Sequence, residues 1–163
     1  MSLPIFIDFE ASSLSGKSYP IEVAWSDQEG NIESWLINPS LYPDTWTDWD
    51  PDSQQIHGLS REYLAEHGKP PLIVAERMNQ HLQDQILYSD APDYDGFWLR
   101  RLFEAAGIDP EFRLADAMKL LHSLHPEYNR FASYAREKAG GIHRASFDVS
   151  YLIELYRFCV YPP

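Results

Sequence analysis

The order of the apolar segments constrains the fold of this chain more than any other feature of the sequence. Three short apolar runs near the start have the length of β-strands: residues 3–9, 21–25 and 32–37. Between the second and third runs, residues 27–31 have the composition of a tight hairpin turn. Two further short apolar stretches, residues 85–89 and 112–114, alternate with segments of helical periodicity. This order predicts an α/β domain in which helices flank one mixed five-stranded sheet.

Helices are expected in six segments, namely residues 60–64, 71–84, 95–107, 116–125, 128–138 and 146–160. Residues 38–53 differ from all of these, because they contain three prolines, four aspartates and two tryptophans without any periodicity. We therefore expect a long surface loop there, and loops of that length are often functional.

Composition limits the class of protein. A chain of 163 residues that is 44% hydrophobic is long enough for one compact core, so we expect a single domain over residues 1–163. The single cysteine, Cys159, excludes an intramolecular disulfide and a multi-cysteine zinc site. No apolar run approaches the ~20 residues of a membrane span, and no basic segment precedes the first apolar run. We expect a cytoplasmic protein that does not associate with membranes.

The net charge of −12 argues at first against a nucleic-acid partner, because lysine and arginine drive phosphate binding. The charge is unevenly distributed, however. Residues 1–110 hold 19 acidic and 6 basic side chains, whereas residues 111–163 hold 6 acidic and 7 basic ones. Divalent cations bound to some of these carboxylates would reverse the local field, so the overall charge does not decide the partner.

Two acids, Asp8 and Glu10, stand at the end of the first predicted strand. Side chains at positions i and i+2 of a strand point to the same face, so both carboxylates project together from an otherwise apolar segment. A cation between them would relieve their repulsion. The alternative is a strand end that has simply reached solvent.

Two more acidic segments lie far along the chain. Asp148 falls in the first turn of the last predicted helix, where an acid favours the helix dipole without further function. With a cation on Asp148, the nearby His143 would be suited to deprotonate a water; the alternative is an exposed histidine without a role. Asp90, Asp93 and Asp95 cluster after the fourth strand. Either Asp93 and Asp95 only cap the next helix, or one of the three acids supplies the remaining cation ligand. Oxygen ligands of this kind suit Mg²⁺ or Mn²⁺ rather than zinc.

Taken in order, these segments resemble those of the DEDDh (DnaQ-like) 3′–5′ exonucleases, a family with a ribonuclease H-like fold that includes ribonuclease T, oligoribonuclease and the replicative proofreading subunit. Five motifs carry the resemblance: Asp8-Phe-Glu10, Ile56-His57-Gly58-Leu59-Ser60, Tyr94-Asp95-Gly-Phe-Trp98-Leu99, Asp116-Ala-Met-Lys-Leu and His143-Arg-Ala-Ser-Phe-Asp148. The resemblance spans nearly the whole chain, from about residue 3 to residue 156.

The resemblance implies a role for each acidic residue. Asp8 would bridge two Mg²⁺ or Mn²⁺ ions, Glu10 and Asp148 would complete the site of the ion beside the attacking water, and Asp95 would serve the second ion. His143 would be the general base. The catalytic set is therefore Asp8, Glu10, Asp95, His143 and Asp148.

The sequence also departs from the family pattern. The family usually carries a His-Asn pair at the end of the fourth strand, where this chain has Ser89-Asp90. The acidic cluster leaves the second-motif ligand ambiguous; we choose Asp95 because Tyr94, Trp98 and Leu99 then match the pattern, and Asp93 is the alternative.

Substrate contacts are expected from five residues near these motifs: Ala11, Ser12, Ser13, His57 and Arg144. Phe9 is expected to pack in the core. Trp46 and Trp49 either stack on bases or cover the sheet.

The function we expect is that of a metal-dependent exonuclease. It would hydrolyse the 3′ end of single-stranded RNA or DNA and release nucleoside 5′-monophosphates, with RNA slightly favoured although the motifs do not distinguish the sugars. A homodimer is compatible with the sequence. The alternatives are a non-catalytic nucleic-acid- or protein-binding module on the same fold, and an acidic interaction domain whose motifs match by accident.

Overall fold

A computed structural model describes residues 2–141 and 143–163. Within these residues the strands form one five-stranded sheet in the order β3-β2-β1-β4-β5. The strands are β1 (Ile5–Ala11), β2 (Pro20–Ser26), β3 (Ile32–Leu36), β4 (Ile86–Ser89) and β5 (Arg113–Asp116). β2 pairs antiparallel with both β1 and β3. On the other side of β1, β4 pairs parallel with β1, and β5 pairs parallel with β4. The prediction of a mixed five-stranded sheet flanked by helices is confirmed.

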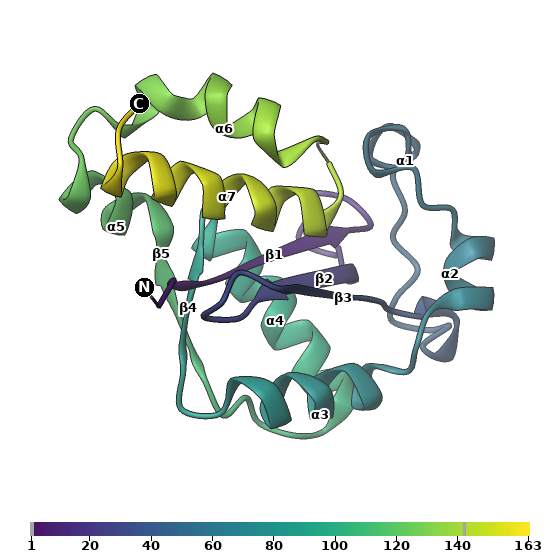
Figure 1. Ribbon diagram of the computed structural model, residues 1–163. Coiled ribbons are helices and arrows are strands. Elements are labelled where there is room, and N and C mark those ends of the chain that lie inside the picture. The colour runs from purple at the N-terminus through teal and green to yellow at the C-terminus, as the bar shows by residue number, and fades with distance from the viewer. Residues whose placement is uncertain (1, 142) are drawn as a thin grey trace.

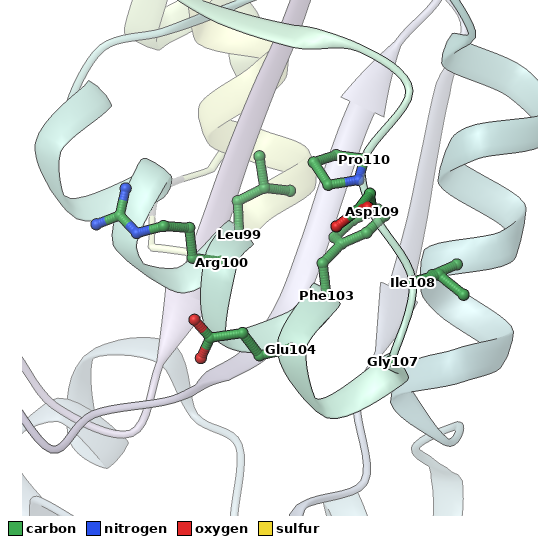
Figure 2. Close-up of a pocket in the computed structure, with 8 residues that line it drawn as sticks. All are labelled: Leu99, Arg100, Phe103, Glu104, Gly107, Ile108, Asp109 and Pro110. Carbon is green, nitrogen blue, oxygen red and sulfur yellow. The ribbon is translucent and has the colours of Figure 1, made fainter.

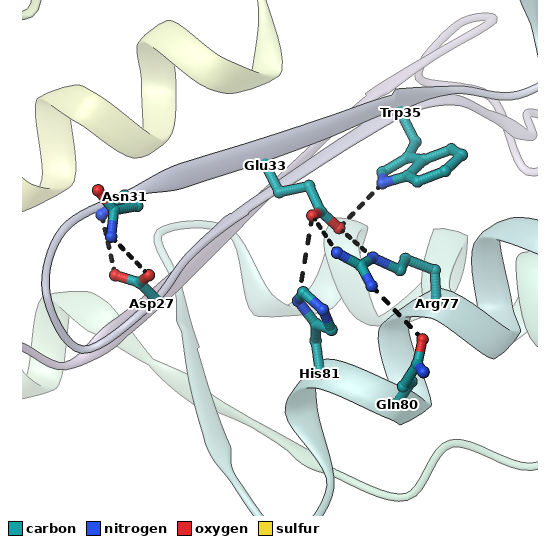
Figure 3. Close-up of polar contacts among 7 residues, drawn as sticks. All are labelled: Asp27, Asn31, Glu33, Trp35, Arg77, Gln80 and His81. Carbon is teal, nitrogen blue, oxygen red and sulfur yellow. Dashed lines mark hydrogen bonds and ion pairs between the residues drawn. The ribbon is translucent and has the colours of Figure 1, made fainter.

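The turn between β2 and β3 explains why this meander forms locally. The carboxylate of Asp27 accepts a hydrogen bond from the backbone N–H of Glu29 at 2.8 Å. It also accepts one from the backbone N–H of Asn31 at 2.9 Å (Figure 3). Gly30 adopts a φ of +91°, a conformation that costs glycine little. The turn chemistry visible in the sequence therefore sets the hairpin.

Helices cover both faces of the sheet and its edge (Figure 1). They are α1 (Pro51–His57), α2 (Arg61–His67), α3 (Pro71–Leu82), α4 (Pro92–Ala106), α5 (Ala117–Leu124), α6 (Ala132–Ala139) and α7 (Ala145–Val160), with short 3₁₀ turns at Pro39–Leu41 and Tyr128–Phe131. In Figure 1, α5, α6 and α7 lie above the sheet and α3 and α4 below it. None of the helices in the described residues is long and apolar enough to cross a bilayer.

The apolar residues of β1 belong to two different core clusters, because the strand sends alternate side chains to opposite faces of the sheet. Ile5, Ile7 and Phe9 join the larger apolar cluster, which includes α3 and α4. On the opposite face, Phe6 packs with α7 in a smaller cluster that includes Leu152. Phe9 thus packs in the core, as predicted.

Several predicted boundaries are wrong. β1 continues through Ala11, since its pairing with β2 extends to Ala11 and Pro20; the acidic pair is therefore inside the strand rather than beyond its apolar part. α4 begins at Pro92, three residues before the predicted start. The single helix expected over residues 128–138 is a 3₁₀ turn followed by α6.

The predicted surface loop at residues 38–53 is only partly a loop. It begins with the 3₁₀ turn Pro39–Leu41 and ends in the first turn of α1, which Asp50 caps through the backbone N–H groups of Asp52 and Ser53. Trp46 is buried and stacks on Tyr19, with ring centroids 5.2 Å apart. Of the two roles considered for Trp46, the geometry favours packing over base stacking.

A polar network fastens the edge strand β3 to α3 (Figure 3). Glu33 accepts two hydrogen bonds from Arg77, at 2.8 and 2.7 Å, and a third from the Trp35 indole at 3.0 Å. His81 lies 4.0 Å from the same carboxylate. These contacts stabilise the sheet edge far from the acidic residues.

Candidate active site

The register of β1 and β4 brings acids from distant parts of the chain together. The two parallel strands pair Ile5 with Leu87 and Phe6 with Tyr88. Two residues further along each strand come Asp8 and Asp90, so both reach the same edge of the sheet. In open α/β sheets, the carboxyl ends of the strands are where ligands bind. The pairing of β1 with β2 shifts register between Glu10 and Ala11, and β-bulges, which produce such shifts, are common beside active sites.

Five carboxylates meet at this edge and form two groups of three. Asp8, Glu10 and Asp148 make one group, and Asp8, Asp90 and Asp95 make the other. Within each group, one oxygen from every residue lies within 4.8 Å of the others. Asp8 belongs to both groups, so its carboxylate stands between two potential cation positions.

Asp8 shows that this arrangement suits a cation. Its side chain is only 8% exposed, and its Oδ2 atom is buried without a hydrogen-bond partner among the described residues. A buried carboxylate oxygen without a partner carries a large desolvation cost. Mg²⁺ and Mn²⁺ prefer carboxylate oxygens, so the donor set fits either ion.

Asp95 is held in one orientation. The Ser89 hydroxyl donates a 2.5 Å hydrogen bond to it, and the Phe9 backbone N–H is a second donor. Asp93, two residues earlier, is exposed and belongs to neither group in the described part of the chain. Side chains two residues apart on an α-helix point about 200° apart around the helix axis. Only one of these two aspartates can therefore face the other carboxylates.

Asp148 is placed by the start of α7, and Glu22 on β2 fixes that start. The buried Glu22 carboxylate accepts the backbone N–H of Ala145 at 2.9 Å. It also accepts hydrogen bonds from Arg144 Nε at 3.0 Å and Nη2 at 2.6 Å. The sheet thus holds the first turn of α7, from which Asp148 projects.

His143 directly precedes this clamp. It is exposed and has a φ of +61°, in the left-handed region that non-glycine residues rarely adopt. Its backbone hydrogen-bonds to the Asp148 carboxylate. The structure therefore places His143 beside the acidic centre, next to Asp148.

Burial and mutual repulsion dominate the electrostatics of the centre. Burial raises the pKa of Asp8 well above its usual range, and the charges of Asp95 and Glu10 add to the effect. Burial and the charge of Asp148 raise the pKa of Glu10 to about 9. Burial raises the pKa of Asp95 to about 8, although the Ser89 hydrogen bond opposes the rise. For Asp148, burial and the charge of Asp90 raise the pKa. Bound divalent cations would reverse these shifts.

A small cleft of about 130 Å³ opens beside Glu10 and is lined in part by Ala11, Ser13, His57 and Trp98. His57 is buried; its Nδ1 accepts the Leu59 backbone N–H at 3.0 Å, while Nε2 has no partner among the described residues. Burial lowers the pKa of His57. The structure thus gathers three of the predicted substrate residues, Ala11, Ser13 and His57, around one cleft.

Ser12 and Ser13 already have hydrogen-bond partners. Both hydroxyls donate to Asp48, at 2.9 and 2.6 Å. Ser12 also accepts the Tyr19 backbone N–H at 3.1 Å, and Ser13 accepts that of Ser15 at 3.0 Å. Asp48 from the 38–53 segment therefore holds the turn that follows β1.

Arg144, predicted to contact substrate, is engaged in the ion pair with Glu22 described above. Its side chain remains 39% exposed, so one edge of the guanidinium can still meet a ligand. The structure adds a positioning contact that the sequence prediction did not include.

The sequence-based prediction missed two residues of this region, Glu22 as the clamp of α7 and Asp48 as the partner of the serines. It named Asp90 in the acidic cluster but did not predict that Asp90 and Asp95 join the same group. A signal existed for Glu22, because it is a single acid inside the apolar run of residues 21–25. For Asp90 and Asp48, the decisive contacts join residues far apart in the sequence.

Several hollows elsewhere in the described residues are larger than the cleft beside Glu10. A pocket of about 380 Å³ lies at the opposite end of α4, where Leu99, Phe103 and Pro110 contribute to its walls (Figure 2). Arg100, Glu104 and Asp109 also line it. Among the described residues, none that lines this pocket belongs to either carboxylate group. The size of the pocket is therefore no reason to place the candidate active site there.

Comparison with solved structures shows that the fold is similar to that of exonuclease I, including the E. coli enzyme. One structure, reported to suggest how processivity is achieved, is 18% identical, with a TM-score of 0.72 over 98% of this chain and 41% of that one. A complex with a dA16 oligonucleotide is 18% identical, with a TM-score of 0.69 over 98% of this chain and 41% of the other. A complex with dT13 is 16% identical, with a TM-score of 0.71 over 97% of this chain and 41% of the other.

These likenesses show the fold. The chain has the fold of these exonuclease I structures, and the predicted ribonuclease H-like α/β fold is confirmed. It spans about two fifths of the length of the exonuclease I chains. No protein-family model matches the sequence. No curated protein matches it significantly.

Proposed function

We propose that residues 1–163 form a metal-dependent 3′–5′ exonuclease unit that acts on single-stranded nucleic acid and releases nucleoside 5′-monophosphates. The observation that carries this proposal is the convergence of Asp8, Glu10, Asp95 and Asp148, with Asp8 shared between two carboxylate groups. Two cations held side by side are the usual device for phosphodiester hydrolysis.

Each carboxylate has a place in the proposed centre. Asp8, Glu10 and Asp148 would hold one cation, and Asp8 and Asp95 the other. When bound, Mg²⁺ or Mn²⁺ would supply positive charge to the attacking and leaving oxygens of the scissile phosphate. The Ser89 hydroxyl and the Phe9 backbone N–H keep Asp95 oriented for this task.

His143 is proposed as the general base that takes the proton of the attacking water. Its exposed position beside Asp148 supports this role, because a carboxylate nearby stabilises the imidazolium that forms. The Glu22 clamp on Arg144 and Ala145 positions the segment that carries both residues.

The cleft beside Glu10 is proposed to receive the 3′-terminal nucleotide. Ala11, Ser13 and His57 line it, and the unpartnered Nε2 of His57 offers a polar contact. Ser12 supports the same turn through Asp48, and the exposed edge of Arg144 is positioned for a phosphate. The oligonucleotides dA16 and dT13 bound to the similar exonuclease I chains support a single-stranded substrate.

A labelled-strand assay tests the proposal. Matched RNA and DNA oligonucleotides, labelled at the 5′ or the 3′ end, are incubated with Mg²⁺ and then with chelator. We expect 5′-labelled strands to shorten stepwise and 3′-labelled strands to release labelled mononucleotide at once, both only with the metal. The ratio of the RNA and DNA rates gives the sugar preference. Binding without any cleavage in Mg²⁺ or Mn²⁺ would favour the non-catalytic module instead.

A further inference from the structure

Asp90 has a place in the fold that the four-acid motif does not account for. It follows β4 directly, and the pairing of Phe6 with Tyr88 puts it level with Asp8 on the neighbouring strand. Its side chain is exposed, whereas Asp8 and Asp95 are buried. Asp90 therefore stands where the carboxylate centre opens to solvent.

The atoms needed for a cation position are already close together there. One oxygen each from Asp8, Asp90 and Asp95 lies within 4.8 Å of the other two. Ser89 holds Asp95 from the same turn, because its hydroxyl donates to Asp95 at 2.5 Å and accepts the Ala91 backbone N–H at 3.0 Å. The turn that presents Asp90 is thus fixed relative to Asp95.

A second observation points independently to a ligand. Asp8 is more than nine-tenths buried, yet its Oδ2 atom has no hydrogen-bond partner in the described part of the chain. Among the described residues, no lysine or arginine forms a salt bridge with any of these three aspartates. Buried charges in proteins are either paired with an opposite charge or coordinate a metal, and no opposite charge that the structure describes is paired with these carboxylates.

We propose that Asp90 is a third carboxylate ligand of the cation shared by Asp8 and Asp95. This inference extends the proposed function, because it adds a ligand to the same centre. With Asp90, each cation position has three carboxylates, and the affinity of oxygen-ligand sites rises with the number of charged ligands. The chain then binds two divalent cations before any substrate phosphate arrives.

The test measures metal binding in the absence of nucleic acid. Mn²⁺ is titrated into the wild-type chain, into Asp90→Asn and into Asp93→Asn by calorimetry, with free Mn²⁺ followed by electron paramagnetic resonance. We expect two bound ions in the wild type. In Asp90→Asn we expect one ion at unchanged affinity and the other weakened at least about tenfold. Asp93→Asn is the matched control, since it removes a charge from the same segment outside both carboxylate groups, and it should bind like the wild type.

Three results would overturn the inference: two ions bound by Asp90→Asn with wild-type affinities, a wild type that binds only one ion, or an equal loss in Asp93→Asn. Circular dichroism and thermal unfolding confirm that each variant is folded. Because Asp90 is exposed, its substitution leaves the core intact.

The outcome separates this inference from the proposed function. If the wild type binds two ions, Asp90→Asn loses one and no oligonucleotide is cleaved, then the ligand role of Asp90 stands and the exonuclease proposal fails. If the wild type cleaves from the 3′ end while Asp90→Asn keeps both ions, the exonuclease proposal stands and the ligand role fails.

Discussion

The two faces of strand β1 differ in what they contact. On one face, Ile7 and Phe9 pack into the larger apolar cluster with α3 and α4. On the other, Asp8 and Glu10 stand among carboxylates, and burial raises the pKa of both. The seven residues of β1 thus give one face to core packing, while the other face combines the core residue Phe6 with the carboxylates of the candidate site. A strand with a period of two can separate these tasks by a single residue step.

The comparison of the two faces of β1 indicates where the proposed site lowers the stability of the fold. The apolar face gains free energy from burial, at about 25 cal/mol for each Å² removed from water. The acidic face concentrates like charges in a partly desolvated edge, which opposes folding. The following predictions test this division, from the largest expected effect to the smallest.

Substitution of Asp8 should separate activity from stability most strongly. We expect Asp8→Ala to lower the rate of oligonucleotide cleavage by at least about 10²–10³-fold, the usual effect of removing one group that stabilises transition-state charge. In chelator, the conservative Asp8→Asn should be as stable as the wild type or more stable, because it removes a buried charge. Single-turnover rates and thermal unfolding measure the two effects, and retained cleavage would refute the assignment of Asp8.

Substitution of the neighbouring Ile7 should do the reverse. Ile7 is fully buried, so Ile7→Ala should lower the free energy of unfolding by about 2–5 kcal/mol through lost burial and a residual cavity. The cleavage rate per folded molecule should change little. Urea denaturation with a matched single-turnover assay tests this, and a large loss of rate at full folding would break the division between the faces.

Loss of the Glu22 clamp should affect both properties moderately. Glu22→Gln keeps an acceptor for the Ala145 N–H but loses the charge paired with Arg144. We expect a cost of about 1–3 kcal/mol and a slower reaction, because the α7 turn that carries Asp148 is less firmly held. Urea denaturation and the rate measured across a Mg²⁺ titration would show it. An unchanged Mg²⁺ dependence would mean that Glu22 serves stability alone.

The stability of the protein in chelator should fall as the pH rises from about 4 to about 9. Unfolded carboxyl groups titrate near ~4, whereas the pKa is about 9 for Glu10 and about 8 for Asp95 in the folded chain. Between these values the folded state binds more protons than the unfolded state, so stability declines with pH. The melting temperature should drop by about 2–4 °C for each kcal/mol lost.

Added Mg²⁺ should restore the melting temperature far more at pH 8 than at pH 5, because protonated carboxylates do not bind the ion. A melting temperature that rises with pH in chelator would contradict the proposed electrostatics of the acidic face.

The smallest effect is expected at the ion pair between Glu33 on the edge strand β3 and Arg77 on α3 (Figure 3). Neither residue belongs to the two carboxylate groups. Both side chains are about one third exposed, and ion pairs of this kind contribute about 1 kcal/mol or less. Arg77→Ala should therefore cost little stability and leave cleavage unchanged. If Arg77→Ala lowered the rate as much as Glu22→Gln does, the rate loss in Glu22→Gln would be a general response to a lost ion pair.

The sequence predicted the strands better than the helix starts. The first three strands were found within two residues because alternation, apolar runs and the Asp27 turn are local signals. The start of α4 was missed because Pro92 and Asp93 also suit a loop. Because the predicted helix began at residue 95, Asp93 lay outside it, and helix geometry could not tell which of Asp93 and Asp95 faces the other acids.

The sequence by itself determined the α/β class, the order of the strands along the chain and the set of acids available for chemistry. These follow from short-range preferences: strand and helix periodicity, turn residues and charge. Only the tertiary structure decided that Asp90 joins Asp8 and Asp95, that Asp93 points away and that Glu22 holds Arg144. Those choices depend on the register of parallel strands about 80 residues apart and on the packing of α4 and α7 against the sheet. Packing depends on contacts between side chains from all parts of the core. A short segment of the sequence does not specify those contacts.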